Sequence, residues 1–170
     1  YIEDDRMKFD TKKCIQCGKC VEVCYSESME MIGNKMTVDE VMKEIEKDNV
    51  FYEESGGGVT FSGGEPFMQH EFLRELLIQC KKKDIHTVVD TCGFVKKDIL
   101  VEISNLIDSF LYDLKIMNET EHIKYTGVSN KIILDNLKEI TRLGKRIFIR
   151  IPVIPGINDD DENISGIAKH

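Results

Sequence analysis

Short apolar runs alternate with segments of helical periodicity along most of the chain, and no other feature constrains the fold as strongly. Four runs have the length and composition of buried strands: 59–62, 85–90, 109–114 and 146–154. Four further segments repeat apolar residues every three or four positions, as helices do: 37–48, 72–83, 99–107 and 130–143. A last helix begins near Asp159. Because strand and helix alternate and the strands are almost continuously apolar, the pattern predicts an α/β fold with parallel strands buried on both faces.

The residues best suited to bind a ligand follow the predicted strands. They are Gly63 and Gly64, Asp90 and Thr91, Asp113 and Lys115, and Arg150. In parallel α/β folds, sites form at the edge where the carboxyl ends of the strands meet. Adjacent glycines let the backbone approach a ligand closely, and Glu65 can accept a hydrogen bond from a ligand ammonium group. The Gly-Gly-Glu-Pro sequence is equally typical of a structural turn.

Four cysteines lie at the spacing C-x2-C-x2-C-x3-C: Cys14, Cys17, Cys20 and Cys24. This is the spacing of bacterial ferredoxins, and it predicts thiolate ligands for [4Fe–4S] clusters. A zinc site or a set of unligated thiols is the alternative. Zinc sites usually combine two C-x2-C pairs or cysteine with histidine, and neither pattern is present in this sequence. Tyr25 replaces the proline that usually follows the fourth cysteine, a departure that affects the loop exit more than the ligands.

Charge and composition exclude several classes of function. The net charge is −8, which argues against binding to nucleic acid or to an anionic membrane surface. No long apolar run and no signal-peptide pattern occur, so we expect a cytoplasmic protein that neither spans nor binds a membrane. The chain begins with Tyr1 rather than Met and stops at His170, just after a helix start, and we expect it to be a piece of a longer protein.

The stretch from Ser55 to Pro66, SGGGVTFSGGEP, resembles the S-adenosylmethionine (SAM) binding motif of radical SAM enzymes. In particular it resembles the activating enzymes of glycyl radical enzymes, the pyruvate formate-lyase-activating enzyme group. Four other stretches agree with this group in order and spacing: 89–94, 111–115, 125–130 and 149–156. The resemblance extends roughly from Cys14 to Ile164.

The resemblance implies a fold and a division of the chain. Residues 37–170 would form part of a six-stranded radical SAM (β/α) barrel, with four of the strands visible here. Residues 1–36 would form half of a ferredoxin-like iron–sulfur insert. In ferredoxins with two clusters, the first three cysteines of a run hold one cluster and the fourth holds the other. We therefore expect Cys14, Cys17 and Cys20 to share one cluster whose fourth ligand lies before Tyr1, and Cys24 to serve a second cluster. Anaerobic reconstitution that gave this chain about eight irons would refute this expectation.

The resemblance also implies roles for the residues at the strand ends. SAM would be bound by Gly63, Gly64, Glu65, Asp113, Leu114, Lys115 and Arg150. A monovalent cation near the SAM carboxylate would be held by Asp90, Thr91 and Asp113, with a backbone carbonyl from Leu111. The alternatives are solvated or helix-capping acids and ordinary surface cations. Arg150 stands between apolar neighbours in a strand, so we expect it to be little exposed.

No catalytic residue can be assigned, because the radical SAM cluster signature C-x3-C-x2-C is absent from these residues. We therefore expect this chain by itself to be inactive. Cys80 falls on the apolar face of the helix at 72–83, and Cys92 occupies a strand end where a small residue suffices. Neither is assigned to a metal. His86 and His122 show no shared pattern and are expected at the surface.

By resemblance, the function is the activation of a glycyl radical enzyme. Reductive cleavage of SAM by a [4Fe–4S] cluster would give a 5′-deoxyadenosyl radical, which takes a hydrogen from a glycine Cα of the partner enzyme. Electrons would come from a flavodoxin- or ferredoxin-type donor. Two alternatives stay open: another radical SAM enzyme that acts on a small molecule or peptide, and a non-enzymatic ferredoxin-like electron-transfer module.

Overall fold

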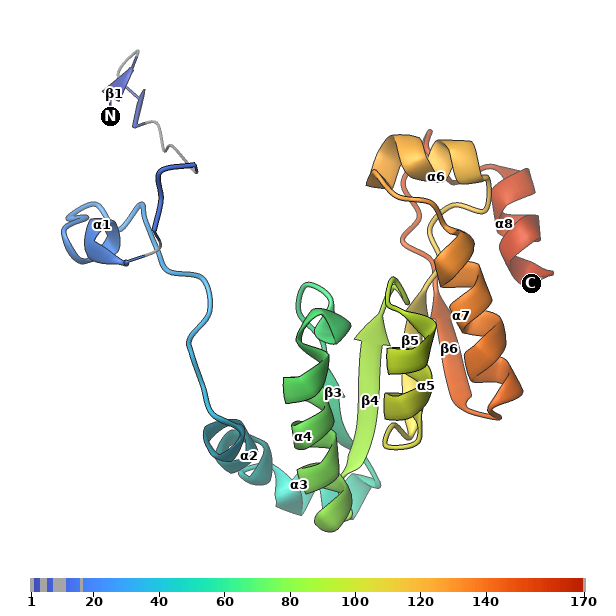
Figure 1. Cartoon of the computed structure of the whole chain (residues 1–170), viewed down its shortest axis with the longest axis horizontal. Helices are drawn as coiled ribbons and strands as arrows, with labels where there is room; N and C mark the ends of the chain where they lie inside the picture. Colours follow the sequence, from blue (N-terminus) through green and yellow to red (C-terminus); the bar gives the residue numbers. More distant parts are fainter. Residues whose placement is uncertain (1, 4–5, 8–11, 16, 170) are drawn as a thin grey trace. The chain divides into compact units, whose positions relative to one another are not determined.

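The computed structural model describes residues 2–3, 6–7, 12–15 and 17–169, and it divides into two compact units at residue 36 (Figure 1). Tyr1 and His170 are the first and last residues of the predicted segments 1–36 and 37–170, and both lie outside the described residues. In the first unit, β1 (Ile2–Glu3) and β2 (Arg6–Met7) pair antiparallel. The short helix α1 (Lys19–Glu22) follows within the cysteine-rich loop.

The second unit contains a four-stranded sheet in the order β3-β4-β5-β6, with every neighbouring pair parallel. The strands are β3 (Gly58–Phe61), β4 (His86–Thr91), β5 (Ser109–Asp113) and β6 (Arg146–Arg150). Strand order follows chain order, which is the arrangement expected when each crossover passes through a helix. The predicted α/β fold with a parallel sheet is confirmed.

Helices connect the strands and supply most of the core. They are α2 (Val38–Glu46), α3 (Asn49–Ser55), the 3-10 helix η1 (Pro66–Gln69), α4 (His70–Lys82), α5 (Lys97–Ser104), α6 (Glu119–Thr126), α7 (Lys131–Arg142) and α8 (Asp161–Ala168). The predicted capping box is present, because Glu40 N–H donates to Thr37 Oγ1 while Thr37 N–H donates to the Glu40 carboxylate. Among the described residues, no helix combines the length and the apolar character that a membrane span requires.

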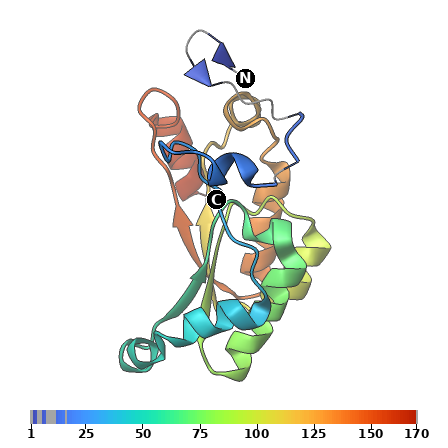
Figure 2. The same cartoon turned by 90° about the vertical axis from the view of Figure 1, so that its left-hand side faces the viewer.

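The two faces of the sheet differ in burial. Helices α4, α5 and α7 lie over one face, as Figures 1 and 2 show, and there Val89, Phe110 and Tyr112 are fully buried. On the other face Asp90 is half-buried and Arg150 is exposed. The expectation of burial on both faces therefore holds for one face only, because the core helices pack on a single side of these strands.

Strand β6 is shorter than predicted, because it ends at Arg150 instead of Ile154. The backbone beyond it bonds to a side chain and not to a neighbouring strand: Asn158 donates to the carbonyl of Pro152 at 2.9 Å and accepts from the N–H of Ile154 at 2.7 Å. Pro152 has no N–H to offer a ladder. The apolar residues after Arg150 therefore belong to a loop that is folded around Asn158.

Helices α5 and α7 are joined by an ion pair that should make stability depend on pH. The Glu139 carboxylate lies 2.7 Å from Lys97 Nζ and 3.0 Å from Arg142 Nε. The hydrogen bond from Arg142, and to a smaller extent that from Lys97, lowers the pKa of Glu139 from 4.5 to about 2. A carboxyl group whose pKa is depressed in the folded state stabilises it above the unfolded pKa and loses this contribution as the pH falls.

Glu139→Gln should therefore destabilise the fold near neutral pH, and its deficit should shrink as the pH falls from about 4.5 to about 2. Thermal unfolding of both proteins across this range measures the deficit. Glu102→Gln, on an exposed part of α5, serves as the control and should show a small difference from wild type at every pH. A deficit for Glu139→Gln that stays constant with pH would contradict the prediction.

Candidate functional site

The carboxyl ends of the four parallel strands bring the predicted ligand residues to one edge of the sheet. The strand register sets Asp90 opposite Leu111, and Asp113 opposite Arg150. Lys115 follows two residues after the end of β5. Residues far apart in the sequence thus lie side by side because parallel strands all end at the same edge.

Arg150 links the two aspartates of this edge. Its Nε lies 3.0 Å from Asp113 Oδ1, and its Nη2 donates to Asp90 Oδ1 as well. Ser62 Oγ donates to the other oxygen of Asp90 at 2.9 Å, while Lys115 Nζ lies 4.0 Å from Asp113 Oδ2. The hydrogen bond that Arg150 donates to Asp113, and then the charges of Asp113 and Asp90, raise the pKa of Arg150. The site is therefore a preassembled group of two acids and two cations.

The expectation that Arg150 is little exposed is wrong, because 43% of its side chain is accessible. The apolar neighbours Ile149 and Ile151 suggested a buried position. Arg150, however, is the last residue of β6 and points to the face that the core helices leave open. Its guanidinium is thus available to a ligand while it is held by two carboxylates.

The turn after β3 exposes backbone at the same edge. Gly63 has a φ of +124°, a conformation that residues with a side chain rarely adopt. A Cβ atom added to Gly63 or Gly64 would meet no heavy atom within 4 Å. A glycine is therefore required by backbone conformation at Gly63, and open space lies where a Cβ would stand at both positions.

Glu65 is turned toward the protein. Its Oε1 accepts from Thr91 Oγ1 at 2.7 Å and from Phe67 N–H at 3.3 Å, and its Oε2 accepts from Cys92 N–H at 3.0 Å. The Cys92 thiol donates to Oε2 as well, at 3.0 Å. A carboxylate offers about four acceptor positions, so the role visible in the structure is to brace the β3 turn against the end of β4.

Cys92 and Cys80 have the properties of protonated thiols. Burial, and then the hydrogen bond to Glu65, raise the pKa of Cys92 to about 11. Burial likewise raises the pKa of Cys80 to about 11, and its side chain is fully buried against Met42. Metal ligation requires thiolates. Cys80 packs in the core as predicted, and neither thiol is assigned to a metal.

Sequence reasoning missed the support of the loop after β4. Asn136 of α7 is buried and donates to the carbonyls of Gly93 and Val95, both at 2.8 Å. Tyr112 Oη donates to the carbonyl of Ile133 at 2.6 Å and lies against Gly93. The glycine that follows Cys92 was the available signal, since a glycine after a strand end often marks close approach by another group.

Gly93→Ala should destabilise the fold strongly. Gly93 has a φ of +72°, and a Cβ there would lie 1.7 Å from Tyr112 Oη. The backbone strain and the clash together should cost about 3 kcal/mol of unfolding free energy. Gly127→Ala is a matched control, because Gly127 has a φ of +81° but open space around its Cβ, so only about 1 kcal/mol should be lost. Equal losses in urea unfolding would contradict the assigned clash.

The prediction that His122 lies at the surface is wrong, because His122 is only 3% exposed. Its Nδ1 lies 2.7 Å from the carbonyl oxygen of Val128 and 2.9 Å from Thr126 Oγ1. The charged neighbours in the sequence lie on other faces of α6. His122 therefore closes the turn between α6 and α7, which is one of the stretches on which the family resemblance rests.

In the first unit, three of the four clustered cysteines line one pocket. Cys14, Cys17 and Cys20 border a pocket of about 640 Å³ whose wall includes Met29 and Met31. Cys24 does not line it. Hydrogen bonds with Ser28 at 3.4 Å and Ser26 at 3.6 Å lower the pKa of Cys24 to about 7. Ser28 lines the pocket while Cys24 does not, and the division of the four cysteines between two clusters stays a prediction.

The donor set of this pocket suits an iron–sulfur cluster. Three thiols face a space with largely apolar walls, and Gly18 makes the turn between them with a φ of +78°. Within the part of the chain that the structure describes, no three side chains of Cys, His, Asp or Glu already converge on a metal position. Binding a cluster would therefore draw the thiols of this loop closer together.

Comparison with known families gives two matches. The model of the Radical SAM superfamily matches residues 20–165, and that of a 4Fe-4S binding domain matches residues 6–29. A crystal structure of a domain of pyruvate-formate lyase-activating enzyme from Bacteroides vulgatus is 39% identical, with a TM-score of 0.62. The alignment covers 66% of this chain and 70% of that chain.

Curated relatives agree with these matches. The trans-4-hydroxy-L-proline dehydratase activating enzyme of Clostridioides difficile is 45% identical over 92% of this chain and 62% of its own length. The isethionate sulfite-lyase activating enzyme of Oleidesulfovibrio alaskensis is 40% identical over 98% of this chain and 55% of its own length. The chain thus spans a little more than half the length of the curated relatives it matches.

Proposed function

Since the chain belongs to the radical SAM superfamily, and within it to the activating enzymes of glycyl radical enzymes, we propose that the full-length protein activates such an enzyme. The observation that carries the proposal is the edge where Arg150 and Lys115 lie beside Asp90 and Asp113, next to the open backbone of the β3 turn. This group of charges suits a ligand that has both a carboxylate and an ammonium group, as SAM does.

When bound, SAM and a [4Fe–4S] cluster supply the 5′-deoxyadenosyl radical that takes a hydrogen atom from a glycine Cα of the partner. This chain's own residues bind and orient. Arg150 and Lys115 would donate to the SAM carboxylate, and the backbone of Gly63, Gly64 and Leu114 would border the ligand. Glu65 and Asp113 would support SAM binding indirectly. Glu65 braces the β3 turn, and Asp113 holds the guanidinium of Arg150.

We also propose a monovalent cation at Asp90, Thr91 and Asp113. The carboxylates of Asp90 and Asp113 offer the hard oxygen ligands that such a cation takes. The Thr91 hydroxyl already donates to Glu65 and accepts from Gly93 N–H, so its backbone carbonyl is the better ligand. The carbonyl of Leu111, opposite Asp90 in the sheet, is the other oxygen at hand.

Residues 1–36 would act as half of a ferredoxin-like insert and residues 37–170 as part of the radical SAM barrel. The thiols of Cys14, Cys17 and Cys20 would hold one [4Fe–4S] cluster, and Cys24 would serve a second. Such clusters would pass electrons from a flavodoxin- or ferredoxin-type donor. A reducing compartment suits these thiols, and we place the protein in the cytoplasm.

The test uses the full-length protein, reconstituted anaerobically with iron and sulfide. Reduced protein should convert SAM to 5′-deoxyadenosine and should raise a glycyl radical signal in electron paramagnetic resonance when a glycyl radical enzyme encoded beside it is added. SAM cleavage without a protein radical, stimulated only by a small molecule or peptide, would favour another radical SAM activity. Failure to bind SAM would overturn the proposal.

A further inference from the structure

Three buried asparagines from three parts of the second unit contact one short backbone segment, residues 115–117. Asn130 precedes α7, Asn158 lies in the loop after β6, and Asn163 lies in α8; they are 3%, 1% and 6% exposed. Buried amides are retained only when their hydrogen bonds are made. Their convergence on the segment that begins with Lys115 therefore requires an explanation.

Asn158 joins the chain after β5 to the chain after β6. Its Nδ2 donates to the carbonyl of Lys115 at 2.8 Å and to the carbonyl of Pro152 at 2.9 Å. Its Oδ1 accepts from Ile154 N–H at 2.7 Å. A single side chain thus fixes the segment that carries Lys115 relative to the segment that follows Arg150.

Asn163 and Asn130 hold the same segment from two other directions. Asn163 Oδ1 accepts from Met117 N–H at 2.8 Å, and its Nδ2 donates to the carbonyl of Lys115 at 3.2 Å. Asn130 Nδ2 donates to the carbonyls of Ile116 at 3.0 Å and Met117 at 2.8 Å. Each position of the segment is therefore bonded to an amide side chain.

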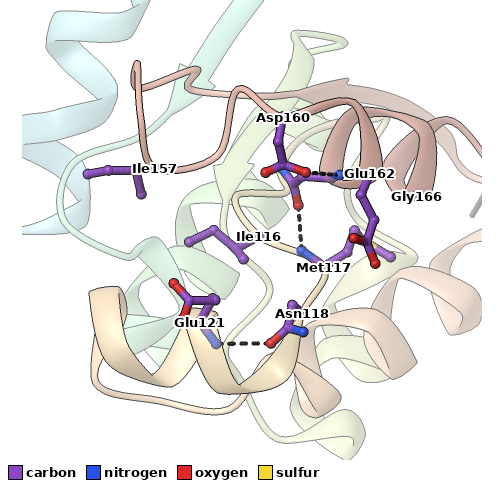
Figure 3. A pocket seen from close by; sticks show the side chains of 9 residues that line it. Ile116, Met117, Asn118, Glu121, Ile157, Asp160, Glu162 and Gly166 are labelled. Atoms are coloured by element: carbon purple, nitrogen blue, oxygen red, sulfur yellow. Dashed lines mark hydrogen bonds between the residues drawn. The ribbon is translucent and has the colours of Figure 1, made fainter.

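Hydrogen bonds matter here because packing is incomplete on one side. A pocket of about 470 Å³ borders the segment and is lined by Ile116 and Met117, by Asp160, which caps α8, and by Glu162 of α8 (Figure 3). Solvent can reach this side of the segment. Ile116 is 7% exposed and Met117 packs against the core, so the amides add to apolar contacts in holding the backbone that carries Lys115.

We propose that Asn130, Asn158 and Asn163 are positioning residues that hold the Lys115 backbone in register with Arg150, so that both cations meet one carboxylate. The inference rests on the proposed function, because it assumes that these cations bind SAM. Amides suit the task, since Asn158 and Asn163 must each donate and accept, which aspartate cannot do when ionised.

A double-mutant cycle in the full-length, cluster-loaded protein tests the proposal. Asn158→Ala should raise the Kd for SAM, measured by equilibrium dialysis, about 10-fold, as losses of outer-shell partners commonly do. Lys115→Met should raise it by a similar factor. In the double variant the Kd should rise by much less than the product of the two single effects, because Asn158 acts largely through Lys115.

A second readout does not need the loaded protein. In hydrogen exchange, Asn163→Ala should increase exchange at the Met117 amide while the strand amides of β4 remain protected.

Thr87→Val is the matched control for the Kd measurements: Thr87 is 1% exposed and is bonded to Asp108 at the opposite end of the sheet. It should lower the melting temperature without changing the Kd for SAM.

The outcomes separate the two proposals. Fully additive effects of Asn158→Ala and Lys115→Met on the Kd, or an equal rise in Thr87→Val, would reduce the asparagines to ordinary structural residues and overturn the inference alone. A wild-type protein that binds no SAM would overturn the proposed function and this inference together.

Discussion

Arg150→Met should weaken SAM binding by the full-length protein about 100-fold, the largest effect expected of any single substitution at the strand edge. The change removes a cation that two aspartates hold in place, with Nε 3.0 Å from Asp113 Oδ1 and Nη2 bonded to Asp90. A charge-assisted hydrogen bond contributes about 1.5–3 kcal/mol. The unpaired aspartates would then repel the carboxylate of SAM, which adds to the loss. Equilibrium dialysis with labelled SAM measures it.

Two variants separate charge from geometry. Arg150→Lys keeps the charge but cannot bridge both aspartates with a planar fork, so binding about 10-fold weaker than wild type is expected. Arg146→Met is the matched control, since Arg146 lies at the amino end of the same strand, with its guanidinium 4.9 Å from the centre of the Phe148 ring. Equal effects at Arg146 and Arg150 would show that binding follows overall charge and would contradict the assignment of Arg150.

The sequence was sufficient for those parts of the molecule that depend on local patterns. The apolar runs and the helical spacing predicted all four strands of the sheet, and the Thr37 capping box fixed the start of α2. Parallel strands end at one edge, so the proximity of Asp90, Asp113 and Arg150 also followed from sequence. A resemblance carried by five motifs then indicated the family.

What could not be predicted depends on contacts between distant residues. Asn158 and Lys115 are separated by 43 positions, and no local pattern links them. The hydrogen bonds of Glu65 with Thr91 and Cys92 form only once β3 and β4 lie side by side. The burial of His122 likewise depends on how α6 turns toward Val128. Periodicity reports which face is apolar but not which polar side chains that face encloses.

The second large effect is expected in the loop that carries the four clustered cysteines. It is a loss of bound iron whose size distinguishes one cluster from two. Cys14, Cys17 and Cys20 line one pocket, whereas Cys24 is engaged with Ser26 and Ser28. In the full-length protein, Cys17→Ala and Cys24→Ala should each lose about four irons after anaerobic reconstitution, and the double variant about eight. If all four thiols served a single cluster, the double variant would lose no more than either single variant.

The control for this experiment is a buried cysteine outside the loop. Cys80→Ala should keep its iron, because burial holds the pKa of Cys80 at about 11 and its side chain is enclosed in the core. The cysteine loop differs, because its thiols border open space and the pKa of Cys24 is lowered to about 7. Thiols at the loop surface can thus reach a cluster, and the additivity of iron loss reports how many clusters they reach.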